Sequence, residues 1–259
     1  MKTAIVTGAT GAIGKAIARQ ILLKGDYHVI MVARDEEKAI RTMHDIMRST
    51  GSDDIDFKIV DLSRKAEIFS LAQQIKRPLH VLVNNAAQSP RRRMETPEGI
   101  ELQWATNVLG YFWMTEAFTS HLSSGAPSRI VNVASYWAGD LDIEDPEYRH
   151  RRYDNDEAYR QSKQSDRMLT VSFAERLKPL GITVNACHPG DVNSKLSNDL
   201  GYGGHETPDQ GADTPAWLAT GQEVQGITGK YFARRHAETC GFSRDKAAIE
   251  RLFKLCKTY

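Results

Sequence analysis

A glycine-rich turn between an apolar run and a helical pattern constrains the fold of this chain more than any other feature. Glycine occupies every third position after the apolar run Thr3–Thr7, at Gly8, Gly11 and Gly14. Apolar residues then recur at helical spacing, at Ile13, Ile17, Ile21 and Leu22. A strand, a tight glycine turn and a helix are typical of dinucleotide-binding domains, because glycines let the backbone approach a pyrophosphate and the helix N-terminus favours its charge. A tight strand–helix turn without a ligand is the alternative.

Short apolar runs alternate with helical patterns along the whole chain. The predicted strands are Thr3–Thr7, His28–Ala33, Asp56–Asp61, His80–Val83, Arg129–Ser135, Thr183–Cys187 and Gly229–Ala233. This alternation predicts an α/β fold with a parallel sheet. No repeat or linker divides the chain, so we expect a single doubly wound Rossmann-type domain over residues 1–259. Its mostly parallel sheet should have about seven strands, with helices on both faces.

Composition narrows the classes of function. A hydrophobic content of 41% supports a sizeable core, and a net charge of +1 gives no signal for a nucleic-acid or membrane partner. Cys187, Cys240 and Cys256 are too few and scattered for a disulfide framework or a zinc site, so we expect a reduced, cytoplasmic setting and no metal. The N-terminus enters a strand at once, which leaves no room for a signal peptide, and no run approaches the roughly 18 apolar residues of a membrane helix.

The end of the second predicted strand bears on the choice of dinucleotide. An acid there often bonds the ribose 2′-hydroxyl of NAD, whereas an arginine can meet the 2′-phosphate of NADP. Ala33 occupies the position expected for the acid and Arg34 follows it, which favours NADP(H) over NAD(H). Asp35, shifted by one residue, is the alternative ribose acid. The acidic run at 35–37 also suits the start of a helix.

A tyrosine and a lysine four residues apart form the second motif with chemical content. Tyr159 and Lys163 would face the same side of a helix. An ammonium beside a phenol stabilises the phenolate, so we expect the pKa of Tyr159 to fall below its reference of about 10. That would give a proton donor and acceptor usable near neutral pH. The pair alone also occurs by chance on surface helices, and its order after the glycine turn makes it informative.

Further motifs occur in one order along the chain: Asp61-Leu62, Asn84-Asn85-Ala86-Ala87, Ser135, Tyr159-x-x-x-Lys163 and Pro189-Gly190. With the glycine turn, they resemble the short-chain dehydrogenase/reductases over essentially the whole chain. The segments 188–194 and 229–232 are similar to the branch of retinol dehydrogenases and related carbonyl reductases. Ala12 and Ala87 stand where the family more often has glycine, and both residues are small enough for the same fold.

The resemblance implies a cofactor site. Asp61 would contact the adenine with Leu62 beside it, and residues 84–86 would line the adenine ribose. Val192 and Ser194 would hold the nicotinamide carboxamide and the nearby phosphate. The full expected set is Gly8, Thr10, Gly11, Ala12, Ile13, Gly14, Arg34, Asp61, Leu62, Asn84, Asn85, Ala86, Tyr159, Lys163, Pro189, Gly190, Val192 and Ser194.

The resemblance also implies an NADP(H)-dependent oxidoreductase that moves a hydride between nicotinamide and a carbonyl or alcohol. Tyr159 would be the general acid/base, and Lys163 would tune it and bond the nicotinamide ribose. Ser135 would bond the substrate oxygen where charge develops, and Asn107 would help hold a proton-relaying water. Each side chain, taken singly, also has an ordinary packing or solvated role as its alternative.

Two segments are expected to form pocket walls. Residues 137–155, rich in Asp, Glu and Arg, lie between Ser135 and Tyr159 and predict an active-site insertion; residues 191–206 predict a substrate loop. Tyr136 and Trp137 suit either a substrate pocket or the core. In the tail Ser243–Tyr259, one helical face carries apolar residues and predicts packing onto the domain: Ile249, Leu252, Phe253 and Cys256.

The expected partner is a small-molecule carbonyl or alcohol. The apolar segment Val108–Phe118 suits a homodimer interface, although the same residues could be ordinary core. Two other classes of function stay open: an NAD(P)-binding sensor without turnover, and a nucleotide-sugar epimerase or dehydratase. The short stretch that follows Gly190 argues against the larger substrate domain of the epimerases.

Overall fold

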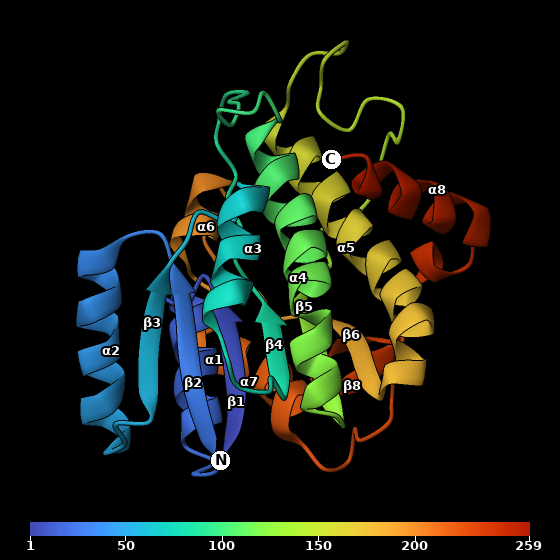
Figure 1. Cartoon of the computed structure of the whole chain (residues 1–259). Coiled ribbons are helices and arrows are strands. Elements are labelled where there is room, and N and C mark those ends of the chain that lie inside the picture. The colour runs from blue at the N-terminus through green and yellow to red at the C-terminus, as the bar shows by residue number, and fades with distance from the viewer.

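A single eight-stranded sheet organises the chain (Figure 1). In the computed structural model, which describes all 259 residues, the strand order is β3-β2-β1-β4-β5-β6-β7-β8. The strands are β1 (Lys2–Thr7), β2 (Tyr27–Ala33), β3 (Ile55–Ile59), β4 (Val81–Asn84), β5 (Ser128–Val133), β6 (Ile182–His188), β7 (Tyr231–Ala233) and β8 (His236–Glu238). All neighbours pair in parallel except β7 and β8. The order reverses between β1 and β4, where open α/β sheets form a ligand crevice.

Helices cover both faces of the sheet (Figure 1). One face carries α1 (Ala12–Leu22), α2 (Glu36–Thr50) and α7 (Pro208–Thr220); the other carries α3 (Lys65–Gln74), α4 (Gly110–Ser124) and α5 (Asn155–Leu177). A C-terminal helix, α8 (Lys246–Lys257), packs against α5. Short helical pieces complete the fold: α6 (Lys195–Asp199), the π-helical turn η1 (Trp104–Leu109), and the 3₁₀ turns η2 (Lys178–Leu180) and η3 (Gly241–Ser243). No helix combines the length and apolar character needed to cross a bilayer.

Strand side chains alternate between two separate hydrophobic cores. Ile5 belongs to the cluster under α3, α4 and α5, whereas its neighbours Ala4 and Val6 belong to the cluster under α1 and α7. All three side chains are fully enclosed. Because helices cover both faces, the strands read as nearly continuous apolar runs rather than as alternating patterns.

The sequence-based fold prediction is confirmed, with one strand added. Each of the seven predicted strands exists, with ends displaced by a few residues, and the predicted helical faces of α1 and α8 pack onto the domain, with Ile13 and Phe253 partly buried and the rest buried. The eighth strand, β8, was missed because His236, Ala237 and Glu238 are exposed at the sheet edge. An edge hairpin strand needs no apolar run, so its sequence carries no strand signal.

The apolar segment considered for a dimer interface is interior core. Its large side chains are at most 4% exposed within the single chain: Leu109, Tyr111, Phe112, Trp113 and Met114. Phe253 of α8 reaches into the same cluster, with its ring centroid 5.2 Å from that of Phe112 and 5.5 Å from that of Phe173. The sequence-based alternative of ordinary core therefore holds, and a homodimer would need a different surface.

Removing a core side chain of α8 should destabilise the whole domain. Leu252 is fully buried, so Leu252→Ala should lower the free energy of unfolding by about 2–5 kcal/mol in denaturant titration. Lys254→Ala on the exposed face of the same helix should change it by no more than about 0.5 kcal/mol. Equal stability of the two variants would mean that α8 is not docked on the domain.

Candidate active site

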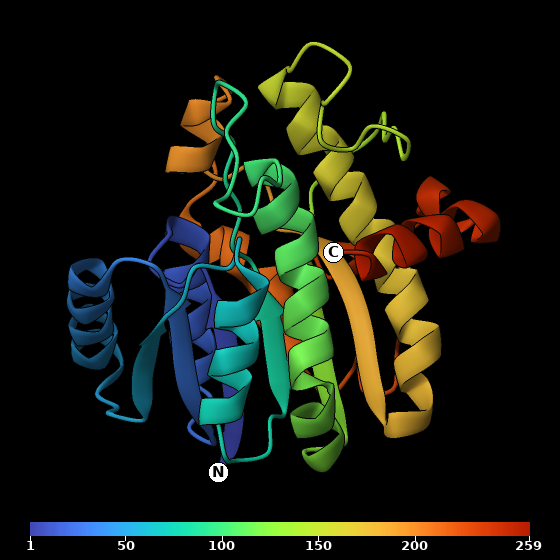
Figure 2. The same cartoon turned by 45° about the horizontal axis from the view of Figure 1, so that its top comes forward.

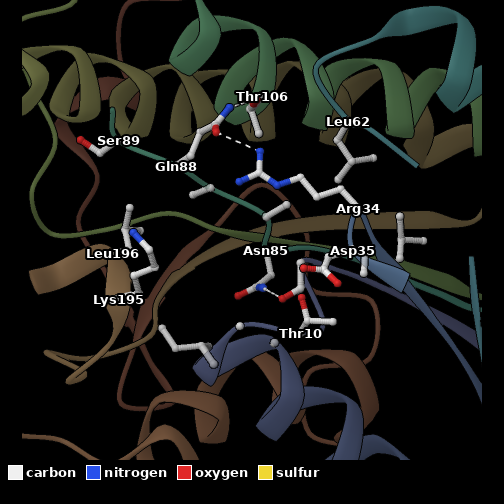
Figure 3. Close-up of a pocket in the computed structure, with 18 of the residues that line it drawn as sticks. Thr10, Arg34, Asp35, Leu62, Asn85, Gln88, Ser89, Thr106, Lys195 and Leu196 are labelled. Atoms are coloured by element: carbon white, nitrogen blue, oxygen red, sulfur yellow. Dashed lines mark hydrogen bonds between the residues drawn. The ribbon is translucent and has the colours of Figure 1, made fainter. Parts of the chain in front are cut away.

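A cleft opens at the carboxyl ends of β1, β2 and β4, at the point where the strand order reverses (Figure 3). It has a volume of about 840 Å³. Its floor is the β1–α1 turn, and its walls come from the loops after β2, β3 and β4 and from α6. Figure 2, with this end of the sheet turned forward, shows α6 and the loop after β4 standing above the strands. Predicted cofactor residues that line the cleft are Gly8, Thr10, Gly11, Ala12, Ile13, Gly14, Arg34, Asp61, Leu62, Asn85, Ala86 and Ser194.

The glycine turn is packed too tightly for side chains. A Cβ on Gly14 would lie 2.3 Å from the Gly8 carbonyl oxygen, and one on Gly8 would lie 2.8 Å from the Ala86 Cα. Gly8 also has a φ of 62°, which L side chains rarely adopt. The turn therefore leaves the N-terminus of α1 bare at the cleft, with no acidic side chain in its first turn. This arrangement fits the pyrophosphate of a dinucleotide.

Arg34 and Asp35 both line the cleft, but their side chains have different partners. The Arg34 Nη1 donates to the Gln88 Oε1 at 3.2 Å (Figure 3). The Asp35 carboxylate instead accepts the backbone N–H of Lys38 at 3.0 Å as the N-cap of α2, and it also pairs with the Lys38 ammonium. Because the partner of Arg34 is a neutral amide, its charge is not compensated by a carboxylate.

Tyr159 and Lys163 lie side by side on α5, both almost fully buried. The Lys163 Nζ is 5.8 Å from the centroid of the Tyr159 ring. The Ser135 hydroxyl interacts with the phenol, and it also accepts the N–H of Trp137 at 3.0 Å. The structure thus brings together the three side chains that the sequence predicted for the reaction. None of them lines the walls of the cleft itself.

The expected fall in the pKa of Tyr159 is not what the structure shows for the free protein. Burial raises the pKa of Tyr159 above its ordinary value and outweighs the opposing charge of Lys163 and the interaction with Ser135. The prediction was wrong in sign because it counted the ammonium and neglected desolvation, which disfavours a buried phenolate. The contribution of Lys163 itself has the expected direction.

Lys163 points inward and is held by two acceptors. Its Nζ donates to the Val133 carbonyl at 3.0 Å and to the Asp166 carboxylate at 2.9 Å. The carboxylate and nearby phenols raise the pKa of Lys163 above its usual range against the opposing effect of burial. Lys163 is therefore an ammonium, as a partner for a phenolate must be.

Asn107 lies in the π-helical turn η1. Its amide oxygen accepts the N–H of Gln88 at 2.9 Å, and its amide nitrogen donates to the Gln88 carbonyl at 2.9 Å and to the Ser162 hydroxyl at 3.3 Å. A π-helical turn often marks a functional position, because it breaks the regular backbone hydrogen bonds. Here Asn107 links η1 to the loop that forms one wall of the cleft.

Several predicted cofactor residues lie outside the cleft walls. Asn84 is fully buried, and its amide donates at 2.9 Å to the side chain of Asn132, its partner across β4 and β5. Val192 and the Pro189 carbonyl lie beside Gly211, while Gly190 lies next to Glu206. The Glu206 carboxylate accepts the N–H of Asp191 at 2.7 Å and occupies the space above Gly190.

The predicted insertion at residues 137–155 is an ordered loop, most of which packs away from the cleft. The Glu147 carbonyl accepts from Arg93, and its carboxylate accepts from the Tyr259 hydroxyl at 2.7 Å. Trp137 is the part that meets the predicted substrate loop. Its indole N–H and the Tyr202 hydroxyl both donate to the same oxygen of Asp156, at 3.1 and 3.2 Å.

Acid should destabilise the protein through His188, which is half-buried at the end of β6. Burial and the neighbouring Arg167 charge lower the pKa of His188 to about 4, and its Nδ1 accepts the N–H of Tyr136 at 3.3 Å. The unfolded chain binds this proton near its reference pKa of about 6.5. As pH falls from 6.5 to 4, the free energy of unfolding should therefore decrease by up to about 3 kcal/mol.

The variant His188→Asn isolates this contribution, because asparagine keeps an acceptor for the N–H of Tyr136 and does not titrate. Chemical denaturation at a series of pH values should show a shallower acid dependence in His188→Asn than in the wild type. Identical slopes in the two proteins would mean that His188 takes up its proton in the folded state as easily as in the unfolded chain.

The sequence analysis missed Gln88 and Asp166. Gln88 follows the Asn85-Ala86-Ala87 motif directly, yet only the structure shows that it holds Arg34. Asp166 stands three residues after Lys163 on a predicted helix, a spacing that places the two on one face. That spacing was a usable signal for the ion pair.

Comparisons with known proteins agree with this geometry. The sequence profile of the short chain dehydrogenase family matches residues 2–202. The chain is 33% identical to retinol dehydrogenase 13 of Mus musculus, over 89% of this chain and 75% of the relative. It is 32% identical to polyprenol dehydrogenase of Mus musculus, over 97% of this chain and 82% of that relative. An uncharacterised protein from Mycobacterium paratuberculosis has a similar structure, with a TM-score of 0.81 and 25% identity, over 100% of this chain and 92% of that one.

Proposed function

Because the chain belongs to the short-chain dehydrogenase family, whose members are NAD(P)-dependent enzymes acting on alcohol and carbonyl groups, we propose that it is an NADP(H)-dependent carbonyl reductase or alcohol dehydrogenase with Tyr159 as its general acid/base. The observation that carries the proposal is the convergence of Ser135, Tyr159 and Lys163 at the carboxyl end of β5, the strand next to β4. The cofactor supplies the hydride, and the protein handles one proton.

Arg34 supports the preference for the phosphorylated cofactor. Its guanidinium lies at the cleft without a carboxylate partner, and a planar, permanently charged fork suits a phosphate dianion. Ala33 brings no acid to this position, and the carboxylate of Asp35 is occupied as the N-cap of α2. The residues of the β1–α1 turn would hold the pyrophosphate, with Asp61 near the adenine.

The proton steps follow from the buried pair. In reduction, Tyr159 donates its hydroxyl proton to the carbonyl oxygen while the Ser135 hydroxyl donates a hydrogen bond to the same oxygen. The phenolate that results is stabilised by the Lys163 ammonium, and a proton from solvent restores the phenol. In oxidation the same atoms act in reverse, with the phenolate as the base.

An apolar alcohol or aldehyde is the proposed substrate class. Two of the relatives named above are a retinol dehydrogenase and a polyprenol dehydrogenase. Exposed aromatic side chains, Tyr136 and Trp137, follow Ser135, and the Trp137 ring lies tilted against Tyr202 with a distance of 5.0 Å between ring centroids. A screen of retinoids, polyprenols, quinones, steroids and short aldehydes, followed by NADPH absorbance, tests both this class and turnover itself. Cofactor binding without turnover of any of them would instead favour a nucleotide sensor.

The cytoplasm remains the proposed location. All three cysteines are free thiols, and Cys187 and Cys256 are buried. Fractionation of the source cells that finds the protein in a membrane or secreted fraction would contradict this part of the proposal.

Removing the Tyr159 hydroxyl should abolish the reaction without removing the cofactor. Tyr159→Phe keeps the ring in its buried position but takes away the proton donor, so kcat should fall by about 10²–10⁴-fold. NADPH affinity, measured by fluorescence titration, should stay close to that of the wild type. Tyr27→Phe, at the opposite end of the sheet, is the matched control and should keep its activity. Wild-type turnover in Tyr159→Phe would refute the mechanism.

Arg34 should account for most of the discrimination between NADPH and NADH. A charge-assisted contact of this kind is worth about 1.5–3 kcal/mol, so Arg34→Ala should weaken NADPH binding roughly 10- to 100-fold and leave NADH binding almost unchanged. Ala33→Asp should shift the preference toward NADH by repelling the 2′-phosphate.

Arg41→Ala is the control for this experiment, since it removes an equal charge from an exposed position on α2 outside the cleft. Both cofactors are titrated by fluorescence for each protein. Tighter binding of NADH than of NADPH by the wild type would mean that Asp35, not Arg34, reads the ribose.

A further inference from the structure

The Lys163 ammonium has a carboxylate partner inside the protein. Asp166 lies one helical turn further along α5, and its Oδ2 is 2.9 Å from the Lys163 Nζ. Neither side chain has any exposed surface. The other oxygen of Asp166 is buried without a hydrogen-bond partner. A carboxylate enclosed in this way is costly unless its charge is compensated, so Lys163 is the group that keeps it charged.

The hydrogen-bond capacity of Lys163 is limited by this arrangement. An ammonium has three N–H donors, and two are used by the Val133 carbonyl and the Asp166 carboxylate. We propose that Asp166 is a positioning residue of the reaction. Its carboxylate holds the Lys163 ammonium in one orientation, so that a single N–H of the ammonium remains for the cofactor. This inference rests on the proposed function, because that function gives Lys163 its role.

Asp166 also sets the charge that Tyr159 experiences. The groups that face Asp166 are Lys163 and Tyr159 on its own helix, Tyr111 from α4 and Cys256 from α8; Cys187 of β6 faces Lys163. Lys163 is the only cation among them. The negative charge of Asp166 raises the pKa of Tyr159 and offsets part of the effect of Lys163. The Asp166 carboxylate is enclosed and is hydrogen-bonded only by Lys163, so it has no path for passing a proton to solvent.

Asp166→Asn removes the charge and keeps the shape, which makes it the decisive variant. In alcohol oxidation with saturating NADP⁺, the rate rises with pH as Tyr159 loses its proton. Without the carboxylate, the midpoint of this rise of rate with pH should move down by roughly one pH unit. The maximal kcat should fall about tenfold or more, because the ammonium is no longer held by the Asp166 carboxylate. Asp166→Glu, which keeps the charge, should retain the wild-type midpoint.

Thr170→Val is the matched control. It removes two buried hydrogen bonds, one to the Asp166 carbonyl and one from the Asn132 side chain, without changing any charge, so the midpoint should not move. A midpoint in Asp166→Asn equal to that of the wild type would overturn the proposal. If the wild type turns over no substrate, the same titration is read from the phenolate absorbance difference between each protein and its Tyr159→Phe counterpart. A wild type without turnover would count against the proposed function alone.

A second measurement covers the case in which Asp166→Asn folds poorly. Breaking a buried ion pair is destabilising, whereas replacing both partners is often nearly neutral. Thermal unfolding of the double variant Lys163→Met/Asp166→Asn should therefore occur at a higher temperature than that of Asp166→Asn alone. A single variant at least as stable as the double variant would show that the ion pair is absent and would refute the positioning role.

Discussion

The buried hydroxyl of Thr7 connects the two strands, β1 and β4, whose ends border the cleft. The Thr7 Oγ1 donates to the Val83 carbonyl at 3.2 Å and accepts the N–H groups of Asn85 at 2.8 Å and Ala86 at 3.1 Å. It thus joins the end of β1 to the end of β4, where a parallel sheet offers no further ladder partner. The close approach of Gly8 to Ala86 depends on this junction. The bare N-terminus of α1 follows from the same geometry.

The burial of charged and titratable side chains is the second constraint on the site. Lys163, Asp166 and Tyr159 have almost no exposed surface, and desolvation acts on each of them. The ion pair keeps Lys163 charged in an apolar setting, where its effect on a developing phenolate is much stronger than it would be in water. The same burial opposes ionisation of the phenol in the free protein. Tyr159 is therefore a protonated phenol in the free protein.

The fold could be predicted from sequence because buried parallel strands and amphipathic helices leave strong periodic signals, as in Thr3–Thr7 and α1. The edge strand β8 could not, since its residues are exposed and follow no apolar pattern. Among site residues, the glycine turn and Tyr159 were marked by local spacing. The tertiary roles of Gln88 and Asn84 had no such signal, because each depends on a side chain brought close only by folding. The sign of the Tyr159 pKa shift failed for the same reason, since burial is a property of the fold.

A crystal structure with NADP⁺ bound tests the central claim most directly. The account predicts the pyrophosphate against the N-terminus of α1, the 2′-phosphate bonded to Arg34 in place of Gln88, and the Lys163 Nζ bonded to a ribose hydroxyl while its contacts to Val133 and Asp166 persist. A 2′-phosphate that points away from Arg34 into solvent, together with a Lys163 that makes no contact with the cofactor, would contradict it.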